Sequence, residues 1–187
     1  MYPSRFQTEV AVEEITQPLE GQFRPSHFNG VTTVVAKLFN LTGPCTATFG
    51  RKDYQQWKIL SRMALDLDMP VEVVGCPIIR EPDGLALSSR NRYLGASERQ
   101  RALGIVTGLR AAHDAWLDGE RDSGKLEELA AEPVRRQFDR VDYVAAVDPE
   151  TLAEPASSPE ALLIAAAAHL GNTRLIDNVV LGRDPRP

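Results

Sequence analysis

Residues 46–56 have the sequence TATFGRKDYQQ, which decides the fold class because a short β-branched run passes directly into a helical pattern. A strand is predicted at Thr46–Phe49 and a helix at Asp53–Leu67, whose inward face is formed by Trp57, Leu60, Ala64 and Leu67. A second strand is predicted at Val71–Val74. Strand, helix and strand in this order indicate a right-handed β-α-β crossover in a parallel sheet.

The pattern continues upstream and changes downstream. A helix is predicted at His27–Leu41, with Pro25 before its first turn and with apolar residues at helical spacing: Phe28, Val31, Val34, Val35 and Leu38. After Val74 the chain becomes polar and rich in proline and glycine, which predicts a domain boundary near Pro77 and a long polar connection beyond it. The predicted parts are therefore residues 1–77, of α/β type, and residues 78–187.

The second part is predicted to be a small α+β domain. Ser97 is expected to cap a helix that runs to about Leu117, because Gln100 follows it at capping-box spacing. A further helix is expected at Leu126–Phe138, where Pro133 is a potential break. Strands are expected at Val141–Val147, Leu162–Ala168 and Thr173–Val180, followed by a frayed tail at 183–187.

Composition excludes several classes of function. A formal charge of -5 and a pI near 5.3 argue against a protein that coats nucleic acid. No apolar run approaches the roughly 20 residues that span a bilayer, and residues 1–12 lack the features of a secretory signal. Two cysteines are too few for a disulfide framework, so the chain is predicted to be cytoplasmic. Its three histidines have no metal-ligand spacing, so no metal site of its own is predicted.

The turn after Thr46–Phe49 is the first candidate site. Gly50 lets the backbone approach a ligand, the following helix start favours anions, and Lys52 adds a positive charge. Gln56 lies one helical turn beyond and could donate to a carboxylate or hydroxyl group. The ordinary alternative is a strand-to-helix turn whose charged side chains face water.

The second candidate site is the run Ser88-Ser89-Arg90, which follows Gly84. Two hydroxyl groups and a guanidinium can surround a polyphosphate, and a mobile loop of this kind could close over a nucleotide. Here the alternative is an ordinary polar linker between domains. A third candidate, Arg24 with His27, lies at a helix start, where capping or packing is the more common role for histidine.

Four motifs in the same order resemble the pantothenate synthetase (pantoate:beta-alanine ligase) family. They are LEGQFRPSHFNGV at 19–31, GRKDYQQ at 50–56, REPDGLALSSRN at 80–91 and LGNTRLIDN at 170–178. The resemblance implies an incomplete Rossmann-like nucleotide-binding domain followed by an α+β lid domain. It also implies ATP-dependent condensation of pantoate with beta-alanine through a pantoyl adenylate, Mg²⁺ accompanying the ATP, and a homodimer.

The resemblance also assigns roles to single residues. It places Gly50, Arg51, Lys52 and Asp53 at ATP, Gln56 at pantoate, Ile79 at the adenosine through its backbone, and Leu87, Ser88, Ser89 and Arg90 in a flexible clamp over the phosphates. Lys52, Ser88, Ser89 and Arg90 are the expected catalytic group, because they would neutralise phosphate charge in the transition state.

The chain departs from the family pattern in three respects. Arg51 and Leu87 stand where many relatives have glutamate and methionine, and the His-x-Gly-His motif that binds the phosphates is not present. Two hypotheses follow: the chain is part of a full pantothenate synthetase, inactive alone, or it is a non-catalytic nucleotide-binding subunit that needs a partner chain. A third, an enzyme acting on RNA, is disfavoured by the acidic charge.

Overall fold

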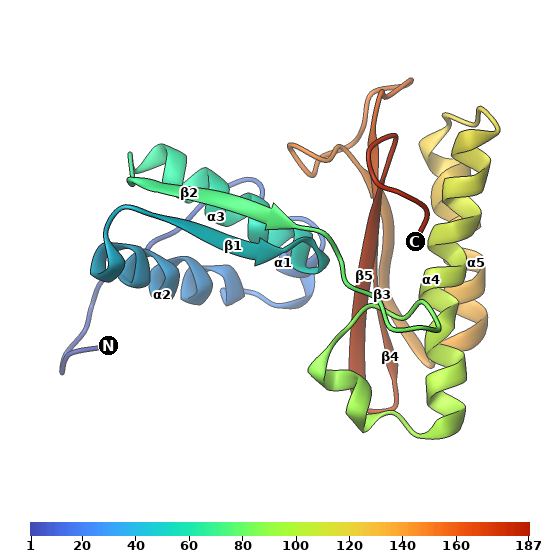
Figure 1. The fold of residues 1–187 in the computed structure, drawn as a ribbon, viewed down its shortest axis with the longest axis horizontal. Coiled ribbons are helices and arrows are strands. Elements are labelled where there is room, and N and C mark those ends of the chain that lie inside the picture. Colours follow the sequence, from blue (N-terminus) through green and yellow to red (C-terminus); the bar gives the residue numbers. More distant parts are fainter. The chain divides into compact units, whose positions relative to one another are not determined.

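The computed structural model describes residues 1–187, and the chain forms two compact units, Met1–Pro77 (unit 1) and Ile78–Pro187 (unit 2) (Figure 1). Unit 1 is of α/β type and unit 2 contains an antiparallel sheet with two helices, so the predicted fold class is confirmed. No helix of the structure combines the length and the apolar character needed to cross a membrane.

Unit 1 contains the predicted β-α-β crossover. Its elements are α1 (Glu20–Phe23), α2 (His27–Thr42), β1 (Cys45–Gly50), a 3₁₀ turn (Arg51–Asp53), α3 (Tyr54–Asp66) and β2 (Val71–Cys76). The two strands are parallel, and the register runs from Cys45 opposite Val71 to Gly50 opposite Cys76. Both carboxyl ends therefore lie at one end of the sheet, and Gly50 is at that end.

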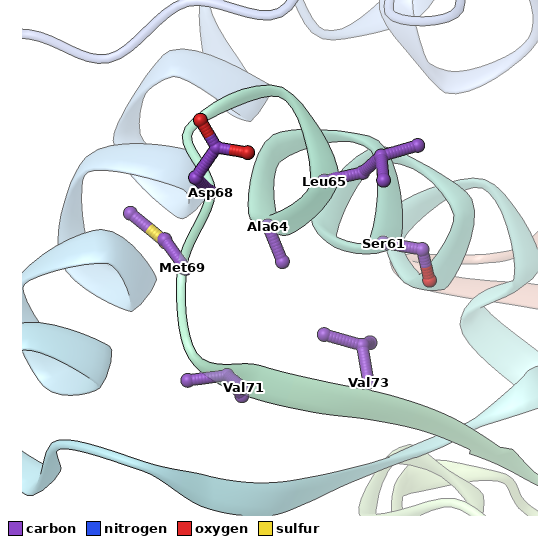
Figure 2. A pocket seen from close by; sticks show the side chains of 7 residues that line it. All are labelled: Ser61, Ala64, Leu65, Asp68, Met69, Val71 and Val73. Atoms are coloured by element: carbon purple, nitrogen blue, oxygen red, sulfur yellow. The ribbon is translucent and has the colours of Figure 1, made fainter.

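The helices α2 and α3 pack on one face of this sheet. Their buried side chains meet strand residues that alternate along β1 and β2, as expected for a strand period of two. The cluster contains Val35, Ala36, Phe39, Leu60, Met63 and Ala64, with Ala47, Phe49, Val71 and Val73 packed against it. Figure 2 shows α3 on one side of the space between helix and strand, and the side chains of Val71 and Val73 on the other.

Two predicted core positions of unit 1 are wrong. Leu38 is 42% exposed and Leu67 is 52% exposed. The buried stripe of α2 passes through Phe39 instead, because Thr32 lies on the inner face and its hydroxyl donates to the carbonyl oxygens of Val10 and Phe28. Leu67 follows the last residue of α3, so helical spacing no longer applies to it.

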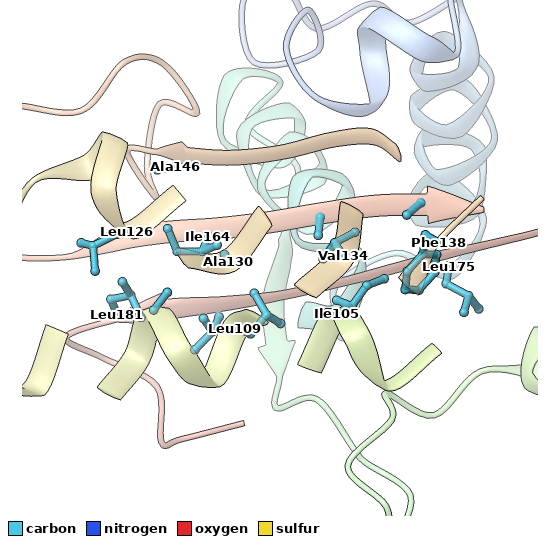
Figure 3. Packing of buried hydrophobic residues seen from close by; sticks show 14 of the residues in the cluster. Ile105, Leu109, Leu126, Ala130, Val134, Phe138, Ala146, Ile164, Leu175 and Leu181 are labelled. Carbon is cyan, nitrogen blue, oxygen red and sulfur yellow. The ribbon is translucent and has the colours of Figure 1, made fainter. Parts of the chain in front are cut away.

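Unit 2 packs two helices against one face of an antiparallel sheet. The elements are a 3₁₀ helix (Ser89–Tyr93), α4 (Ala96–Leu117), α5 (Ser123–Gln137), β3 (Arg140–Val147), β4 (Leu162–Leu170) and β5 (Thr173–Leu181), with strand order β3-β4-β5. Side chains from both helices and from the sheet form one core (Figure 3), including Ile105, Leu109, Leu126, Val134, Ile164 and Leu181.

The contact between α4 and α5 depends on two glycines of α4. A Cβ atom at Gly108 would lie 2.1 Å from the carbonyl oxygen of Ala130, and one at Gly104 would lie 2.9 Å from Cβ of Gln137. The backbones of the two helices therefore approach each other more closely than any larger residue at these positions would allow.

Two details of unit 2 differ from what the sequence suggested. The N-cap of α4 is Gly95, whose N–H donates to Oε2 of Glu98 at 2.8 Å, and Ser97 lies inside the helix. Pro133 does not interrupt α5, because the flanking residues Ala130, Ala131 and Val134 are buried against the core and hold the helix in place. The pattern at Ser97 was misleading because the capping glutamate lies one residue after the serine.

The carboxyl-terminal tail is also ordered by side-chain contacts rather than frayed. Nε and Nη2 of Arg186 donate to the two carboxylate oxygens of Asp114 at 2.7 and 2.8 Å. Nε of Arg110 donates to the carbonyl oxygen of Pro187 at 2.5 Å. Both partners lie on α4, so the tail packs back onto that helix.

Unit 2 contains carboxylates whose pKa lies below the ordinary value. Hydrogen bonds from Arg101 and then from the N–H of Gly171 lower the pKa of Asp139. Burial raises the pKa of Asp142, but hydrogen bonds from Arg174 and His169 outweigh it and leave the pKa lowered. Because the folded pKa is depressed, the stabilisation is present above the unfolded pKa of about 4 and is lost as pH falls through the folded values.

We therefore expect the thermal midpoint of unit 2 to fall when the pH is lowered from 7 to about 3. Trp116, which lies in unit 2 and is 5% exposed, reports this transition by fluorescence in a Trp57→Phe background. The Asp139→Asn variant removes one of the titrating groups and should show a smaller fall over the same range. An unchanged midpoint, or an equal fall in Asp139→Asn, would contradict the role given to Asp139.

Candidate functional site

The carboxyl end of β1 carries the first group of predicted site residues. Gly50 has an extended backbone, and a Cβ atom built there would meet no atom within 4 Å, so space is open beside it. Arg51–Asp53 form a 3₁₀ turn, and α3 begins at Tyr54, one residue later than predicted. The side chain of Lys52 is 15% exposed, with Nζ 3.8 Å from Oδ2 of Asp53. The charged residues thus lie in a tight turn between strand and helix.

The two adjacent glutamines have different environments. Gln55 is 4% exposed; its Oε1 accepts from the N–H of Glu20 at 3.0 Å, and its Nε2 donates to the carbonyl oxygens of Ile15 and Pro18 at 2.9 and 2.8 Å. Gln55 therefore ties the 15–20 segment to α3, a role that sequence reasoning missed. Gln56 is half-buried, and its amide group makes no hydrogen bond within the chain.

The second group of predicted site residues lies on a hairpin in unit 2. Arg80 and Ala86 form an antiparallel bridge, and the N–H of Leu87 donates to the carbonyl oxygen of Ile79 at 2.8 Å. The turn is closed by a hydrogen bond from Gly84 to Glu81 at 2.8 Å, with φ of +96° at Gly84. The polar connection predicted after Val74 thus contains a hairpin, because the backbone is paired on both sides of Gly84.

The residues Ser88, Ser89 and Arg90 lead from this hairpin into the 3₁₀ helix. Oγ of Ser88 accepts from the N–H of Arg90 at 3.2 Å, as a cap of the short helix. Ser89 and Arg90 are exposed, and the residues Leu87 and Ile79 are 55% and 65% exposed. The hydroxyl and guanidinium groups at 89 and 90 are accordingly accessible to a ligand.

The predicted residues fall into two groups by unit. Gly50, Arg51, Lys52, Asp53 and Gln56 lie together in unit 1, whereas Ile79, Leu87, Ser88, Ser89 and Arg90 lie together in unit 2. Arg24 and His27, the third candidate, are in unit 1, and Nη1 of Arg24 lies 3.8 Å from Oε2 of Glu20.

The other histidines are engaged in structural contacts. His113 is 6% exposed, with Nε2 3.3 Å from the carbonyl oxygen of Asp184, and Nε2 of His169 lies 3.0 Å from Oδ2 of Asp142. No group of three or more histidine, cysteine, aspartate or glutamate side chains is arranged to hold a metal ion.

Two cavities of unit 1 lie elsewhere. One of about 430 Å³ lies between α3 and the start of β2 (Figure 2), lined by Ser61, Ala64, Leu65, Asp68, Met69, Val71 and Val73. Another of about 430 Å³ lies between the first nine residues and α2. Neither is lined by a predicted site residue, and the first lies at the amino end of β2, whereas Gly50 is at the carboxyl end of β1. We therefore assign the site from side-chain chemistry rather than from these cavities.

Comparison with known proteins supports the resemblance found in the sequence. The family model described as pantoate-beta-alanine ligase matches residues 1–180. Pantothenate synthetase from Geotalea uraniireducens is 50% identical over 185 residues, which cover 98% of this chain and 66% of the relative. Pantothenate synthetase 1 from Bradyrhizobium diazoefficiens is 50% identical over 188 residues, which cover 99% and 65%.

Solved structures agree. Pantothenate synthetase from Thermus thermophilus matches with a TM-score of 0.90 and 45% identity, over 96% of this chain and 65% of that chain. A pantoate-beta-alanine ligase from Francisella tularensis complexed with beta-gamma ATP and beta-alanine matches with a TM-score of 0.71 and 29% identity, over 100% and 62%. The chain spans about 65% of the length of the relatives it matches. Because the family model matches residues 1–180, nearly the whole of this chain, the chain belongs to the pantoate-beta-alanine ligase family.

Proposed function

We propose that this chain takes part in pantothenate biosynthesis, in the ATP-dependent condensation of pantoate with beta-alanine. The observation that carries the proposal is the family match over residues 1–180, within which the cationic turn after β1 and the Ser88–Arg90 segment both fall. The Francisella relative, whose structure is described as a complex with beta-gamma ATP and beta-alanine, supports ATP and beta-alanine as substrates.

The proposed reaction has two steps. A carboxylate oxygen of pantoate attacks the α-phosphorus of ATP, and the bond to the β-phosphate oxygen breaks to release pyrophosphate. The amine of beta-alanine then attacks the acyl carbon of the pantoyl adenylate, loses a proton and releases AMP. Negative charge develops on phosphate oxygens in the first step, so cationic groups that are fixed in place before reaction lower its barrier.

Each group of residues has a proposed part in this chemistry. Lys52, with Gly50, Arg51 and Asp53, binds the nucleotide at the end of β1, and Gln56 holds pantoate. Leu87, Ser88, Ser89 and Arg90 bind the phosphates, and Ile79 contacts the adenosine. Magnesium would neutralise part of the triphosphate charge; because no cluster of three ligands exists in the chain, we propose that it enters bound to ATP.

We further propose that the chain binds ATP but does not turn over pantoate by itself. His113 and His169 are held in structural contacts, and none of the three histidines belongs to a His-x-Gly-His motif. The alternative is a non-catalytic nucleotide-binding subunit that needs a partner chain. On the family resemblance we also propose that the protein is a homodimer and lies in the cytoplasm. Light scattering of the purified chain would test the dimer.

Calorimetry with ATP and an AMP-release assay with pantoate and beta-alanine test these statements. We expect ATP to bind and AMP release to stay at background. A pantoate-dependent burst of AMP would overturn the proposed inactivity of the isolated chain, whereas absence of ATP binding would overturn its proposed share of the site. Catalysis itself is best measured in the exchange enzyme, defined as the Geotalea relative in which this chain replaces the matching 185 residues.

The adjacent glutamines offer a matched test of the pantoate site. In the exchange enzyme, Gln56→Ala should raise the KM for pantoate by about tenfold through loss of a hydrogen bond, with little change in the unfolding temperature. Gln55→Ala should instead lower the free energy of unfolding by about 2 kcal/mol, because the buried N–H of Glu20 and the partly buried carbonyl groups of Ile15 and Pro18 lose their partners. A raised KM in Gln55→Ala alone would reverse the two assignments.

A further inference from the structure

The four residues Leu87–Arg90, here called the phosphate loop, are closed at their base by one side chain. Nδ2 of Asn91 donates to the carbonyl oxygen of Ala86 at 3.0 Å, so the residues that flank the loop are hydrogen-bonded to each other. Asn91 is 8% exposed and also donates to Oε1 of Glu81 at 2.5 Å. The loop is therefore a short closed segment fastened to the turn of the hairpin.

Glu81 is in turn held by Arg99 of α4. Nη2 of Arg99 donates to Oε2 of Glu81 and to Oδ2 of Asp83, both at 2.7 Å, and its Nε donates to Oδ2 of Asp83 at 2.8 Å. Hydrogen bonds from Arg99 and then Asn91 lower the pKa of Glu81, which agrees with an ionised carboxylate between them. One guanidinium thus fixes both acidic residues of the turn.

A second guanidinium fixes the other side of the hairpin. Nη1 and Nη2 of Arg80 donate to the two carboxylate oxygens of Asp177 on β5 at 2.6 and 3.1 Å, and Nη1 also donates to the carbonyl oxygen of Gly84 at 3.1 Å. The side chain of Asp177 is 4% exposed and that of Arg80 is 18% exposed, so this bidentate pair is largely shielded from water. The hairpin is consequently anchored to α4 and to the sheet.

We propose that Arg99, acting through Glu81 and Asn91, is a positioning residue that holds the phosphate loop in a binding-ready form for the polyphosphate of a nucleotide. The inference rests on the proposed function. A loop held in place before the ligand arrives loses less conformational entropy on binding, and its donors do not have to reorganise. Arg99 itself is occupied by Glu81 and Asp83, so its contribution to affinity is exerted through the loop.

The chain offers a close control for Arg99. Arg101 lies on the same helix and is also paired within unit 2, with Asp139 and the carbonyl oxygen of Gln137. Arg99→Gln and Arg101→Gln therefore remove the same charge from α4, and only the first removes the hairpin's anchor to that helix. Asp83→Asn provides a second way to weaken the anchor while leaving Arg99 in place.

The test measures binding of ATP and of inorganic pyrophosphate to the full 187-residue chain by calorimetry, together with hydrogen exchange. We expect Arg99→Gln to weaken ATP binding about tenfold, and Asp83→Asn to weaken it less, because ordering of the loop then opposes binding. Exchange should speed up within residues 79–91 and stay unchanged in β4. Arg101→Gln should bind ATP within about twofold of the wild type, since Arg101 pairs with Gln137 and Asp139 rather than with the hairpin and its charge is screened by solvent.

The outcomes separate the two levels of the proposal. If the wild type binds ATP and Arg99→Gln binds it equally well, or if Arg101→Gln loses as much affinity, the positioning role is overturned while the proposed function stands. If the wild type binds neither ATP nor pyrophosphate, the proposed function fails and the positioning role with it. Faster exchange throughout unit 2 in Arg99→Gln would show a general structural role and would also overturn the proposal.

Discussion

Replacing Lys52 by alanine is expected to lower kcat of the exchange enzyme by about two to three orders of magnitude, equivalent to roughly 3 to 4 kcal/mol. Lys52 lies in the 3₁₀ turn at the carboxyl end of β1, where parallel sheets usually bind ligands. Its side chain is only 15% exposed, so its charge would act on a phosphate in a partly dehydrated setting. The loss should therefore appear in the chemical step more than in the KM for ATP.

The control for this prediction is Lys58→Ala. Lys58 is a half-buried lysine of the neighbouring helix α3, and its Nζ lies 5.3 Å from the ring centroid of Trp57. Its removal changes the net charge by the same amount and should leave kcat within about twofold, because the effect of a charge away from the reacting groups is screened. Single-turnover release of pyrophosphate measures the step directly. Undiminished turnover in Lys52→Ala would remove Lys52 from the catalytic group.

The elements of the fold could be predicted because the sequence carries their periods locally. Cys45–Gly50 and Val71–Cys76 are bounded by turn residues, and α3 keeps its apolar spacing from Tyr54 onward. The errors occur where polar side chains, which apolar spacing does not describe, decide the outcome. Thr32 occupies an inner-face position of α2, so the buried stripe includes Phe39 rather than Leu38. Glu98 rather than a serine hydroxyl caps α4.

The site residues also divide into those that could be proposed from the sequence and those that could not. The residues proposed to meet a ligand, such as Lys52 and Arg90, could be proposed from the sequence because they lie in compact motifs. The residues that hold them were not found, because their partners are distant in sequence: Arg80 and Asp177 are 97 residues apart, and Gln55 and Ile15 are 40 apart. No local signal distinguished Gln55 from Gln56, since both follow the same turn and differ only in which way the helix faces the core.

The strongest effect expected on folding concerns Gly108. In Gly108→Ala the new methyl group would lie 2.1 Å from the carbonyl oxygen of Ala130, and this oxygen belongs to the backbone of α5 and cannot rotate away. The helices must separate by more than about 1 Å, which opens the core that Leu109 and Val134 share. Alanine is the better helix former by about 1 kcal/mol, but this gain is smaller than the cost of overpacking.

We therefore expect Gly108→Ala to lower the free energy of unfolding of unit 2 by about 3 kcal/mol. Urea titration followed by Trp116 fluorescence, in the Trp57→Phe background, measures this difference.

The matched control is Gly30→Ala in α2, where a Cβ atom would meet nothing within 4 Å. There, without a clash, the same substitution should stabilise unit 1 by up to about 1 kcal/mol through helix propensity alone. Trp57, in a Trp116→Phe background, reports that change. Opposite signs for one substitution in two helices would show that the close approach of α4 and α5 requires glycine, whereas a wild-type midpoint in Gly108→Ala would mean that α5 can move away at little cost.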